Sequence, residues 1–377
     1  MPQEFLAPAR VNLLGEHTDY TGGLVLPMAI PFHTRATLTP LPDPLYRFTS
    51  EHFDTARELQ PADRSAGVGD WSDYPVGVLR ELQARGIEPP PLAMSLRGDV
   101  PLNSGLSSSA SIEVVTAMAL LAQSGSTLPL EEIALLCQHA ENTYVHSPCG
   151  IMDQFVIVAA KAGHALLLHT RTLAYEHIPI NGGALADTRI VVCNSMVKHS
   201  VASGEYGNRR REVEAGQAAI LAKYPQLTDL GEATLDHLEA CADTLSREAF
   251  LRCRHIITEN ARVREAVETM RAGDPVRFGA LMLAGHVSQR DDFAVSCPEI
   301  DFLVETATAL PGCFGARLTG GGFGGCTVNL VDKNAAAAFA ESLKSAYRDA
   351  FNLDAETYLC EAVDGAMLAN AGSERTA

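Results

Sequence analysis

The chain has 377 residues, of which 46% are hydrophobic and 20% charged, so it has room for two ordinary domains and is neither disordered nor fibrous. Its 46 acidic and 29 basic side chains give a net charge of −17, which disfavours binding to nucleic acid or to an anionic membrane. The nine cysteines include no Cys-x-x-Cys pair, so the sequence predicts neither a disulfide framework nor a zinc site. The start of the chain lacks the features of a signal peptide, and no apolar run is long enough to span a membrane, so we expect a cytoplasmic protein.

A loop rich in polar side chains follows a short apolar run near the start of the chain. Within residues 10–23, Glu16, His17 and Asp19 lie between Gly15 and a Gly-Gly pair. Flexible glycines can direct these side chains at a ligand with many hydroxyl groups. The same residues also fit a solvated turn or a metal site, although His-Thr-Asp is not a spacing typical of a particular metal.

Extended structure and one helix are predicted before the next motif. Residues 24–40 are typical of edge or bulged strands, because Pro27 and Pro31 interrupt their apolar pattern. Residues 43–69 are polar and are predicted to be rich in loops. Residues 71–86 have helical spacing, and we expect Trp71 to pack in the core or, alternatively, to form a platform for a base.

A serine-rich stretch after a predicted strand is a candidate phosphate-binding loop. Residues 92–97 alternate as a strand does, residues 98–105 offer turn chemistry, and helical periodicity is present from residue 112. A helix start leaves several backbone N–H groups free and adds the positive end of the helix dipole, and here the serine hydroxyls add further donors. The simpler alternative is that the serines at 107–111 only cap the helix.

Two carboxylates beyond this stretch are candidates for chemistry. Glu141 lies near the end of a helix predicted at residues 130–144, where it is either an exposed surface acid or a group that faces the serines. Asp153 falls in the first turn of a helix that is predicted to follow the Pro/Gly turn at residues 147–150. A carboxylate there either compensates the helix dipole or, if it is buried, requires a partner such as an arginine.

The second half of the chain is predicted to be richer in helix. Strands are expected at residues 165–169 and 189–193, with Asn181-Gly182-Gly183 between them as the domain boundary. Helical segments are expected at residues 200–224, 235–241, 248–272, 275–287, 297–309 and 334–347. The arginines at residues 209–211 are typical of a solvated helix face.

A glycine-dense hairpin is predicted at residues 316–330. Gly320, Gly322 and Gly325 formally match G-x-G-x-x-G, but the loop leads into a strand, so the context of a dinucleotide-binding motif is missing. The sequence has no G-x-x-x-x-G-K-[ST] motif either, which excludes a conventional P-loop. We expect the hairpin to bring its backbone close to a ligand or to another loop.

Three of these stretches resemble the signature motifs of the GHMP kinase superfamily, in their usual order. Residues 10–20, Arg-Val-Asn-Leu-Leu-Gly-Glu-His-Thr-Asp-Tyr, resemble more narrowly the signature of the galactokinase family. Further matches are Gly-Leu-Ser-Ser-Ser-Ala-Ser at 105–111, Cys-Gly-Ile-Met-Asp-Gln at 149–154, Ser-Gly-Glu-Tyr at 203–206 and Thr-Gly-Gly-Gly-Phe-Gly-Gly-Cys at 319–326. The family pattern usually has glycine where this chain has Ala9 and Asn103.

The resemblance implies an α+β fold of two domains with the active site between them. Residues 1–183 would form an N-terminal domain of the ribosomal-protein type, and residues 184–377 a ferredoxin-like C-terminal domain. The implied reaction is the phosphorylation of the anomeric hydroxyl of galactose by ATP with Mg²⁺, giving galactose 1-phosphate and ADP. We expect a monomer whose partners are these small substrates, without nucleic acid or membrane.

The resemblance also assigns individual residues. The sugar contacts are Glu16, His17, Asp19, Gly150, Asp153 and Tyr206. The ATP-binding residues are Pro101, Gly105, Leu106, Ser107, Ser108, Ser109, Ala110 and Ser111. The ligands of Mg²⁺ are Ser108 and Glu141.

Arg10 and Asp153 would flank the reacting hydroxyl. Our hypothesis is that Asp153 accepts the hydroxyl proton while Arg10 stabilises charge near the γ-phosphate. The alternative is that Asp153 only orients the hydroxyl. Other functions that the sequence leaves open are an N-acetylgalactosamine kinase, a mevalonate-type kinase, a galactose and ATP sensor without turnover and, more distantly, a nicotinamide enzyme.

Overall fold

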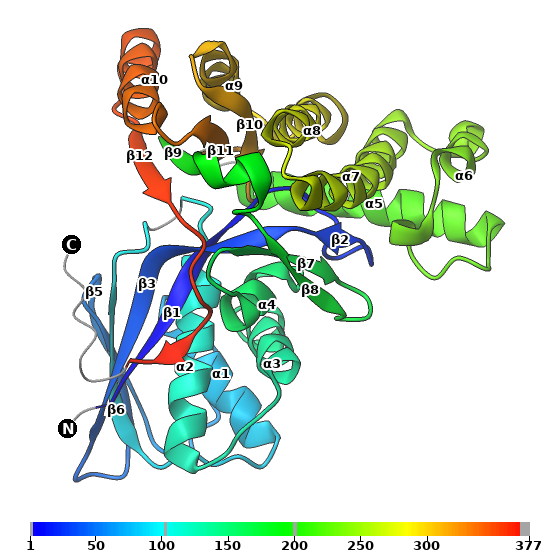
Figure 1. Cartoon of the computed structure of the whole chain (residues 1–377). Helices are drawn as coiled ribbons and strands as arrows, with labels where there is room; N and C mark the ends of the chain where they lie inside the picture. Colours follow the sequence, from blue (N-terminus) through cyan, green and yellow to red (C-terminus); the bar gives the residue numbers. More distant parts are fainter. Residues whose placement is uncertain (1–2, 102–103, 199–201, 370–377) are drawn as a thin grey trace.

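The computed structural model describes residues 3–101, 104–198 and 202–369, which form two α+β halves stacked one above the other (Figure 1). Asn103, one of the two departures from the family pattern, lies outside the described residues. Within the described ranges, no helix is both long and apolar enough to cross a membrane.

A six-stranded sheet forms one side of the first half. Its strands lie in the order β13-β1-β3-β6-β4-β5, and all neighbours are antiparallel except the parallel pair β4 and β6. Their bounds are β1 (Gln3–Asn12), β3 (Pro27–Pro40), β4 (Tyr46–Ser50), β5 (Phe53–Leu59), β6 (Leu92–Gly98) and β13 (Met367–Leu368). The pairing of β1 with β3 shifts between Pro8 and Ala9, opposite Pro31, as the prediction of a bulged strand requires.

Four helices cover one face of this sheet, with a smaller sheet beside them. The helices are α1 (Asp73–Ala84), α2 (Ser108–Ser124), α3 (Leu130–Thr143) and α4 (Met152–Ala159), and α2 and α4 pack directly on β1 and β3 (Figure 1). The smaller sheet contains β2 (Leu24–Val25), β7 (His164–His169) and β8 (Tyr175–Pro179). Each of the four helices was predicted from the apolar spacing of the sequence.

The prediction of loops at residues 43–69 was wrong, because β4 and β5 form a hairpin there. Tyr46 and Phe48 alternate into the core, whereas most of β5 is exposed on both faces because it lies at the edge of the sheet. An edge strand tolerates charged residues such as Arg57 and Glu58, so its composition is that of a loop.

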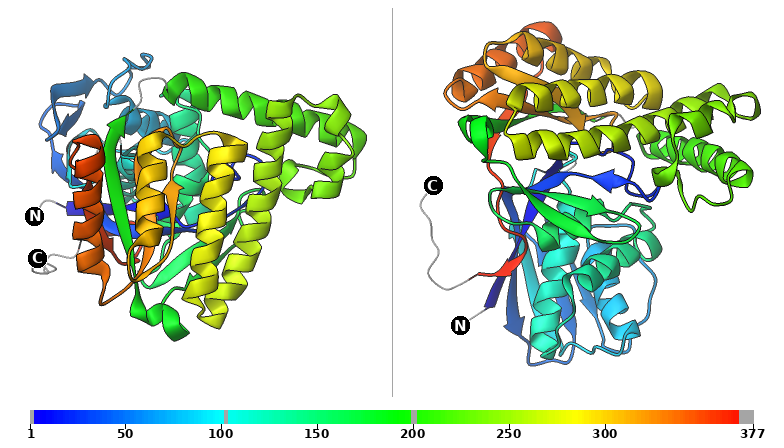
Figure 2. Two further views of the ribbon diagram at one scale, coloured as in Figure 1. Left: turned by 90° about the horizontal axis from the view of Figure 1, so that it is seen from above. Right: turned by 45° about the vertical axis from the view of Figure 1, so that its right-hand side comes forward.

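A four-stranded antiparallel sheet in the order β10-β11-β9-β12 forms the base of the second half. Its strands are β9 (Thr188–Lys198), β10 (Cys313–Thr319), β11 (Gly324–Asp332) and β12 (Glu356–Cys360). The sheet is covered by α8 (Pro275–Ser288), α9 (Pro298–Ala309) and α10 (Ala336–Phe351), which lie side by side in Figure 2.

The remaining helices extend this layer outward. α7 (Arg247–Ala272) packs beside α8, and α5 (Ala202–Lys223) and α6 (Leu235–Glu239) pack against α7 (Figure 2). Short turns complete the second half: the 3₁₀ turns η1 (Gly183–Asp187), η2 (Leu230–Glu232) and η3 (Ala242–Thr244), and the π-helical turn η4 (Gln289–Phe293).

One of the three apolar clusters of the core joins the two halves. It contains Val11 and Met28 from the first half together with Phe278 and Val328 from the second. The chain also returns to its first sheet, because β13 pairs with β1. The division of the chain after residue 183 stays a prediction.

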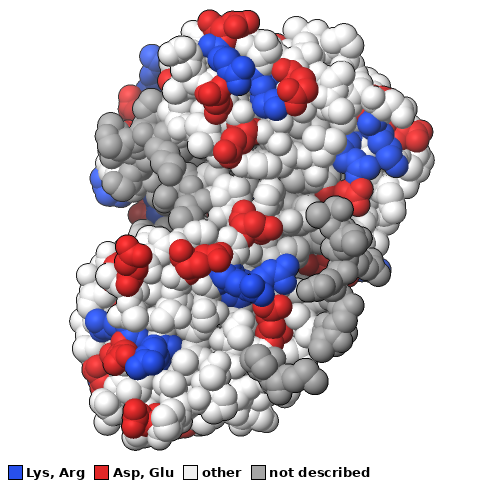
Figure 3. Space-filling model, turned by 90° about the vertical axis from the view of Figure 1, so that its left-hand side faces the viewer, with Lys and Arg blue, Asp and Glu red and all other residues white. Residues whose placement is uncertain are grey.

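Charged side chains on the outer surface are mixed in sign. On the face shown in Figure 3, basic residues lie beside acidic ones and do not gather into a single positive field. This face therefore has none of the clustered positive charge that binding to the phosphates of nucleic acid requires.

Candidate active site

A cavity of about 570 Å³ between the two halves brings the predicted catalytic and sugar-binding residues together. Its walls come from β1, the loop after β1, the turn before α4, α5 and the glycine hairpin. The residues that line it are Arg10, Glu16, His17, Asp19, His146, Ser147, Pro148, Cys149, Gly150, Met152, Asp153, Tyr206, Gly207, Gly320 and Gly321. All six residues predicted to contact a sugar are among them.

Arg10 and Asp153 form a two-pronged ion pair at this cavity. Nε of Arg10 donates to Oδ1 of Asp153 over 2.7 Å, and Nη2 donates to Oδ2 over 2.6 Å. The third arm of the guanidinium donates to the carbonyl of Gly105 over 2.6 Å, and the Ser107 hydroxyl also donates to Asp153. Burial opposes the charge of Arg10, but attraction to Asp153 outweighs it and leaves the pKa of Arg10 raised. The predicted arginine partner of Asp153 is therefore present.

The polar loop after β1 is held from the second half by α7. The backbone N–H of Gly15 donates to Oε1 of Glu259 over 2.8 Å, and that of Leu24 donates to Oδ1 of Asn260 over 2.7 Å. Nε2 of His255 lies 3.1 Å from the carbonyl oxygen of Glu16. Three side chains of one helix thus fix the backbone that presents the predicted sugar-binding residues.

A fully buried ion pair lies behind this loop. Nη1 of Arg317 on β10 donates to Oε1 of Glu259 over 2.8 Å and lies 3.3 Å from the carbonyl oxygen of Leu13. Arg262 donates to the other oxygen of Glu259 over 2.6 Å. Burial alone would raise the pKa of Glu259, but Arg317 and Arg262 hold it well below its usual value. The loop therefore rests on a charged and rigid support.

Glu16 and His17 face the cavity with different chemistry. Glu16 accepts the backbone N–H of Gly320 over 2.9 Å, which ties the loop to the glycine hairpin. His17 has a positive φ of 63° and stacks on Phe293 at a ring distance of 4.3 Å. Burial, together with nearby His255, lowers the pKa of His17 to about 3, so its imidazole is neutral. Its buried Nε2 atom has no partner among the described residues, which suits a hydroxyl ligand.

Asp19 and Gly150 are adjacent, and the glycine makes room for the carboxylate. A Cβ atom on Gly150 would lie 1.9 Å from Oδ2 of Asp19, so no other residue fits there without displacing Asp19. Asp19 accepts the backbone N–H of Met152 at the start of α4. Burial, followed by the charges of Asp153 and Glu16, raises the pKa of Asp19 to about 7.

The serine-rich stretch places the start of α2 next to the ion pair. Ser107 precedes the helix in the left-handed conformation, with φ 63° and ψ 48°. Such backbone strain in a residue other than glycine is typical of functional sites. The first N–H groups of α2 follow directly, and they lack partners within the helix. Gly105 is exposed, whereas Leu106 is buried in the core.

Ser111 has a structural position that the sequence does not indicate. Its hydroxyl is fully buried and donates to the carbonyl of Ala7 over 2.9 Å, with the Thr34 hydroxyl 2.8 Å away. Its backbone N–H donates to the carbonyl of Ser107 over 3.1 Å. Because both donors are used within the fold, we correct the expectation that Ser111 binds ATP. It anchors α2 to the sheet instead.

Glu141 is buried, so the interpretation of this residue as a surface acid was wrong. It is 6% exposed, and Nε2 of Gln154 donates to it over 2.7 Å. Burial and the charge of Asp153 raise the pKa of Glu141 to about 7. The same Gln154 nitrogen lies 3.0 Å from Glu113, a fully buried carboxyl whose pKa is raised well above its usual value by burial and by Glu141.

The serine beside Glu141 is Ser109 and not Ser108. The Ser109 hydroxyl forms a hydrogen bond with Glu141, whereas Ser108 lines a small cavity next to Thr34 and His52. Successive residues of a helix point about 100° apart, so only one of the two can face α3. A buried carboxylate beside a hydroxyl is an all-oxygen donor set that fits Mg²⁺ together with the phosphates of a nucleotide.

The glycine hairpin between β10 and β11 packs closely on the serine-rich stretch. A Cβ atom on Gly325 would lie 3.0 Å from the carbonyl oxygen of Ser104, and one on Gly320 would lie 3.1 Å from that of Gly105. The prediction that the hairpin approaches another loop is confirmed. The cavity is therefore closed on one side by backbone alone.

Several residues of the site were not predicted from the sequence. Phe293 stacks on His17, and Glu259 and Arg317 support the polar loop from the second half. Only Arg317 carries a signal, since a charged residue between apolar neighbours in a strand requires a buried partner. That partner, Glu259, lies 58 residues away in the sequence, and its neighbours in the sequence do not indicate that it is buried.

Comparison with known families agrees with this arrangement. The family model described as "GHMP kinases N terminal domain" matches residues 73–161, and "GHMP kinases C terminal" matches residues 264–349. The fold and the cleft are thus those of a GHMP kinase. A third model, "Galactokinase galactose-binding signature", matches residues 3–40, the segment that carries Arg10, Glu16, His17 and Asp19.

Individual relatives are similar over almost the whole chain. The galactokinase of Homo sapiens is 42% identical over 368 residues, which cover 96% of this chain and 90% of that protein. The galactokinase of Roseiflexus sp. (strain RS-1) is 40% identical, covering 95% and 91%. The structure of Lactococcus lactis galactokinase complexed with galactose matches with a TM-score of 0.92 at 31% identity, covering 97% and 95%. The chain belongs to the galactokinase family.

More distant structures share the fold alone. A mevalonate kinase structure matches with a TM-score of 0.66 at 18% identity and covers 96% of this chain and 99% of its own. The two-domain α+β prediction for this chain is confirmed by the two family models and by the galactokinase structure.

Proposed function

We propose that the cleft transfers the γ-phosphoryl group of ATP to the anomeric hydroxyl of galactose. The chain is an ATP-dependent sugar kinase of the galactokinase family. The observation that carries the finer proposal is the Arg10–Asp153 pair, which touches the serine-rich stretch through Ser107 and Gly105 and shares a cavity with the polar loop. The pair thus lies where a sugar and a triphosphate would meet.

The sugar would bind in the cavity through the polar loop and its neighbours. Glu16, Asp19 and the neutral His17 offer acceptors for hydroxyl groups, and Tyr206 lines the cavity beside His17, with the two ring centroids 5.7 Å apart. The role of Gly150 is indirect, because it lets Asp19 approach α4. The cavity of about 570 Å³ has room for a monosaccharide and a transferring phosphoryl group.

ATP would bind at the start of α2. The phosphates would lie against Pro101, Gly105 and the free N–H groups of Ser108, Ser109 and Ala110, where the helix dipole favours negative charge. Leu106 and Ser107 shape this loop, Leu106 by its burial and Ser107 through its bond to Asp153. Glu141 and the adjacent Ser109 hydroxyl would hold Mg²⁺, which neutralises phosphate charge when it is bound.

In the transfer step, Asp153 accepts the proton of the anomeric hydroxyl as its oxygen attacks the γ-phosphorus. The bond from the γ-phosphorus to the bridging oxygen of ATP breaks, and ADP leaves with that electron pair. Arg10 keeps Asp153 in place and stabilises charge on the transferred group. The Ser107 hydroxyl holds the second oxygen of Asp153, so one carboxylate lone pair remains directed at the cavity.

An ADP-release assay with four acceptors tests the proposal. We expect rapid, Mg²⁺-dependent release with galactose, with galactose 1-phosphate as the product, and little with N-acetylgalactosamine, glucose or mevalonate. Faster release with N-acetylgalactosamine would reassign the substrate. Binding of galactose and ATP without ADP release would identify a sensor.

A further inference from the structure

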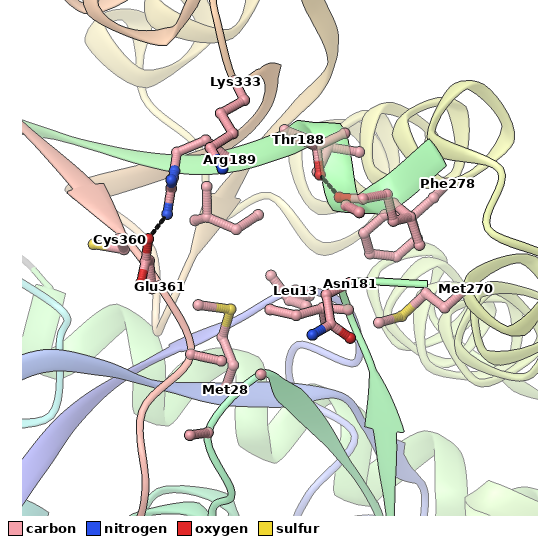
Figure 4. A pocket seen from close by; sticks show the side chains of 18 residues that line it. Leu13, Met28, Asn181, Thr188, Arg189, Met270, Phe278, Lys333, Cys360 and Glu361 are labelled. Carbon is pink, nitrogen blue, oxygen red and sulfur yellow. Dashed lines mark hydrogen bonds and ion pairs between the residues drawn. The ribbon is translucent and has the colours of Figure 1, made fainter. Parts of the chain in front are cut away.

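A second cavity lies between the two halves and shares no residue with the active site. It has a volume of about 340 Å³, and its lining comes from eighteen residues of both halves (Figure 4). Pockets of this size at the junction of two domains are typical binding sites for small molecules. Neither the sugar nor the nucleotide of the proposed reaction uses it.

Apolar side chains from both halves form part of the wall of this cavity, beside polar side chains such as Asn181 and Thr188. Leu13 and Met28 form the side that belongs to the first half, and Met270 of α7 and Phe278 of α8 lie at one end (Figure 4). Ile190 and Leu330 add the sheet of the second half. An occupant with an apolar ring or branched chain would therefore be in contact with both halves and would gain free energy from burial.

Positive charge gathers at the opposite end. Arg189 and Lys333 lie together there, and Arg189 forms an ion pair with Glu361 (Figure 4). The Lys333 ammonium has no ion pair or hydrogen bond with any residue that the structure describes, although its backbone N–H donates to the carbonyl of Asp187 over 2.7 Å. Lys333 is an exposed residue at the edge of the cavity, so its ammonium can meet an anionic group that enters from solvent.

We propose that this cavity binds a small amphipathic organic anion. The apolar body of the ligand lies between Leu13, Met28 and Phe278, and its single anionic group pairs with Lys333. Charge complementarity and the apolar wall together select this class over neutral sugars, which would leave hydroxyl groups unpaired against Leu13 and Met28.

The position of the cavity connects it to the reaction. Leu13 lies on the segment between Arg10 and Glu16, and its carbonyl accepts from Arg317 at the back of the active site. A ligand against Leu13 therefore touches the same short segment that carries residues of both the ion pair and the sugar loop.

Two fluorescent probes with the same apolar body test the proposal. The probe 8-anilinonaphthalene-1-sulfonate carries an anionic group, and N-phenyl-1-naphthylamine lacks it. Both are titrated into the full chain with galactose and a nonhydrolysable ATP analogue in excess, so that the active site is filled. We expect one site for the sulfonate probe, with an affinity about tenfold higher than that of the neutral probe. Equal affinities, or no saturable site for the sulfonate probe, would overturn the proposal.

Two substitutions locate the site. Lys333→Glu should weaken the sulfonate probe about tenfold or more and leave the neutral probe within about twofold, because only the anion loses its partner. Lys344→Glu, on α10 and paired with Glu341, makes the same charge change elsewhere and should alter neither affinity. Ala186→Trp, at an exposed position of the rim, should weaken both probes by filling the cavity.

The substituted chains must be folded for these results to count. Circular dichroism and the melting temperature provide that check. An unchanged sulfonate titration in both Lys333→Glu and Ala186→Trp would place the probe elsewhere and contradict the proposal.

Discussion

Two arginine–carboxylate pairs hold β1 and the polar loop that follows it, the first through Arg10 on the strand and the second through contacts to the loop. They differ in what surrounds them. The Arg10–Asp153 pair borders the active site, where the Asp153 side chain is 25% exposed. The Arg317–Glu259 pair lies behind the polar loop, and both of its side chains are 0% exposed. The chemical groups are the same, but only the first pair has an atom that can meet a substrate.

This difference teaches how one type of interaction takes two roles. All the partners of Glu259 are protein groups: Gly15, Arg262 and Arg317. Asp153 has Arg10 and Ser107 as partners and still faces the cavity. A buried pair whose carboxylate oxygens are both bonded to protein groups fixes backbone, whereas a pair with one open side is free to exchange a proton.

The largest expected effect is on the rate in Asp153→Asn. The amide keeps the shape of the carboxylate but cannot accept the hydroxyl proton, so kcat should fall by about 10²–10⁴. Single-turnover measurement of phosphoryl transfer checks this. The melting temperature should fall as well, because the buried Arg10 loses its counter-charge.

The exposed Asp349→Asn on α10 is the matched control and should keep the full rate. Near-normal turnover in Asp153→Asn would show that the residue only orients the hydroxyl.

The second pair is broken by Glu259→Gln. Arg317 and Arg262 would lose their counter-charge inside the protein, so the free energy of unfolding should fall by about 3–5 kcal/mol. Denaturant unfolding measures this loss, and KM for galactose should rise more than kcat falls because the loop loses its support.

Glu265→Gln removes an exposed carboxylate of the same helix that pairs with Arg277, and it should cost less than about 1 kcal/mol. A similar loss of unfolding free energy in both variants would contradict the proposed stabilising role of the buried pair.

A smaller effect is expected from Glu141→Gln on the requirement for metal. With one anionic ligand gone, the Mg²⁺ concentration for half-maximal activity should rise about tenfold or more. Displacement of bound Mn²⁺, followed by electron paramagnetic resonance, reports the same change without turnover. Glu132→Gln at an exposed position of α3 is the control, and equal metal affinity in the two variants would remove Glu141 from the metal site.

The smallest effect is a pH dependence from Asp19. Because its pKa is raised to about 7, the side chain is protonated below that pH and loses an acceptor for sugar hydroxyls. The affinity for galactose should therefore fall as pH drops from about 8 to 6, by less than about tenfold per pH unit. Calorimetric titrations of galactose across this range should show a flat profile in Asp19→Asn and an unchanged slope in Asp243→Asn, an exposed aspartate of η3.

Folding stability should depend on Asp19 in the opposite direction. The folded protein holds this proton more tightly than the unfolded chain, whose aspartates titrate near 3.8. The stabilising contribution is complete below that pH and is lost as pH rises toward 7. Unfolding midpoints at several pH values would reveal this slope, and Asp19→Asn should reduce it, while the raised pKa of Glu141 leaves a remainder.

The sequence predicted the residues that line the candidate active site better than the residues that hold them in place. Arg10, Glu16, His17, Asp19 and Asp153 occur in short motifs whose residue types match their chemistry, and all five line one cavity. Glu259 and His255 support the polar loop, but the sequence around them has only an ordinary helical pattern. Their role could not be predicted, because it depends on contacts between distant segments. The motifs indicated residues that line the cavity, whereas supporting contacts depend on tertiary packing.

Local geometry explains the remaining errors. Ser108, Ser109 and Ser111 are indistinguishable in a run of serines, yet rotation around a helix sends Ser109 toward Glu141 and Ser111 into the core. The polar composition of β5 led to the prediction of a loop, although this segment is a strand. An edge strand is exposed and can have the composition of a loop.

The pairing of β13 with β1 has a consequence for the synthesis of the chain. Phe5 and Leu6, near the start of the strand that carries Arg10, meet Leu368 and Met367 from far along the sequence. On the ribosome, the outer edge of β1 therefore stays open until almost all of the described chain has been translated. An unpaired strand edge is a template for aggregation, so nascent chains of this protein should depend on chaperones until β13 emerges.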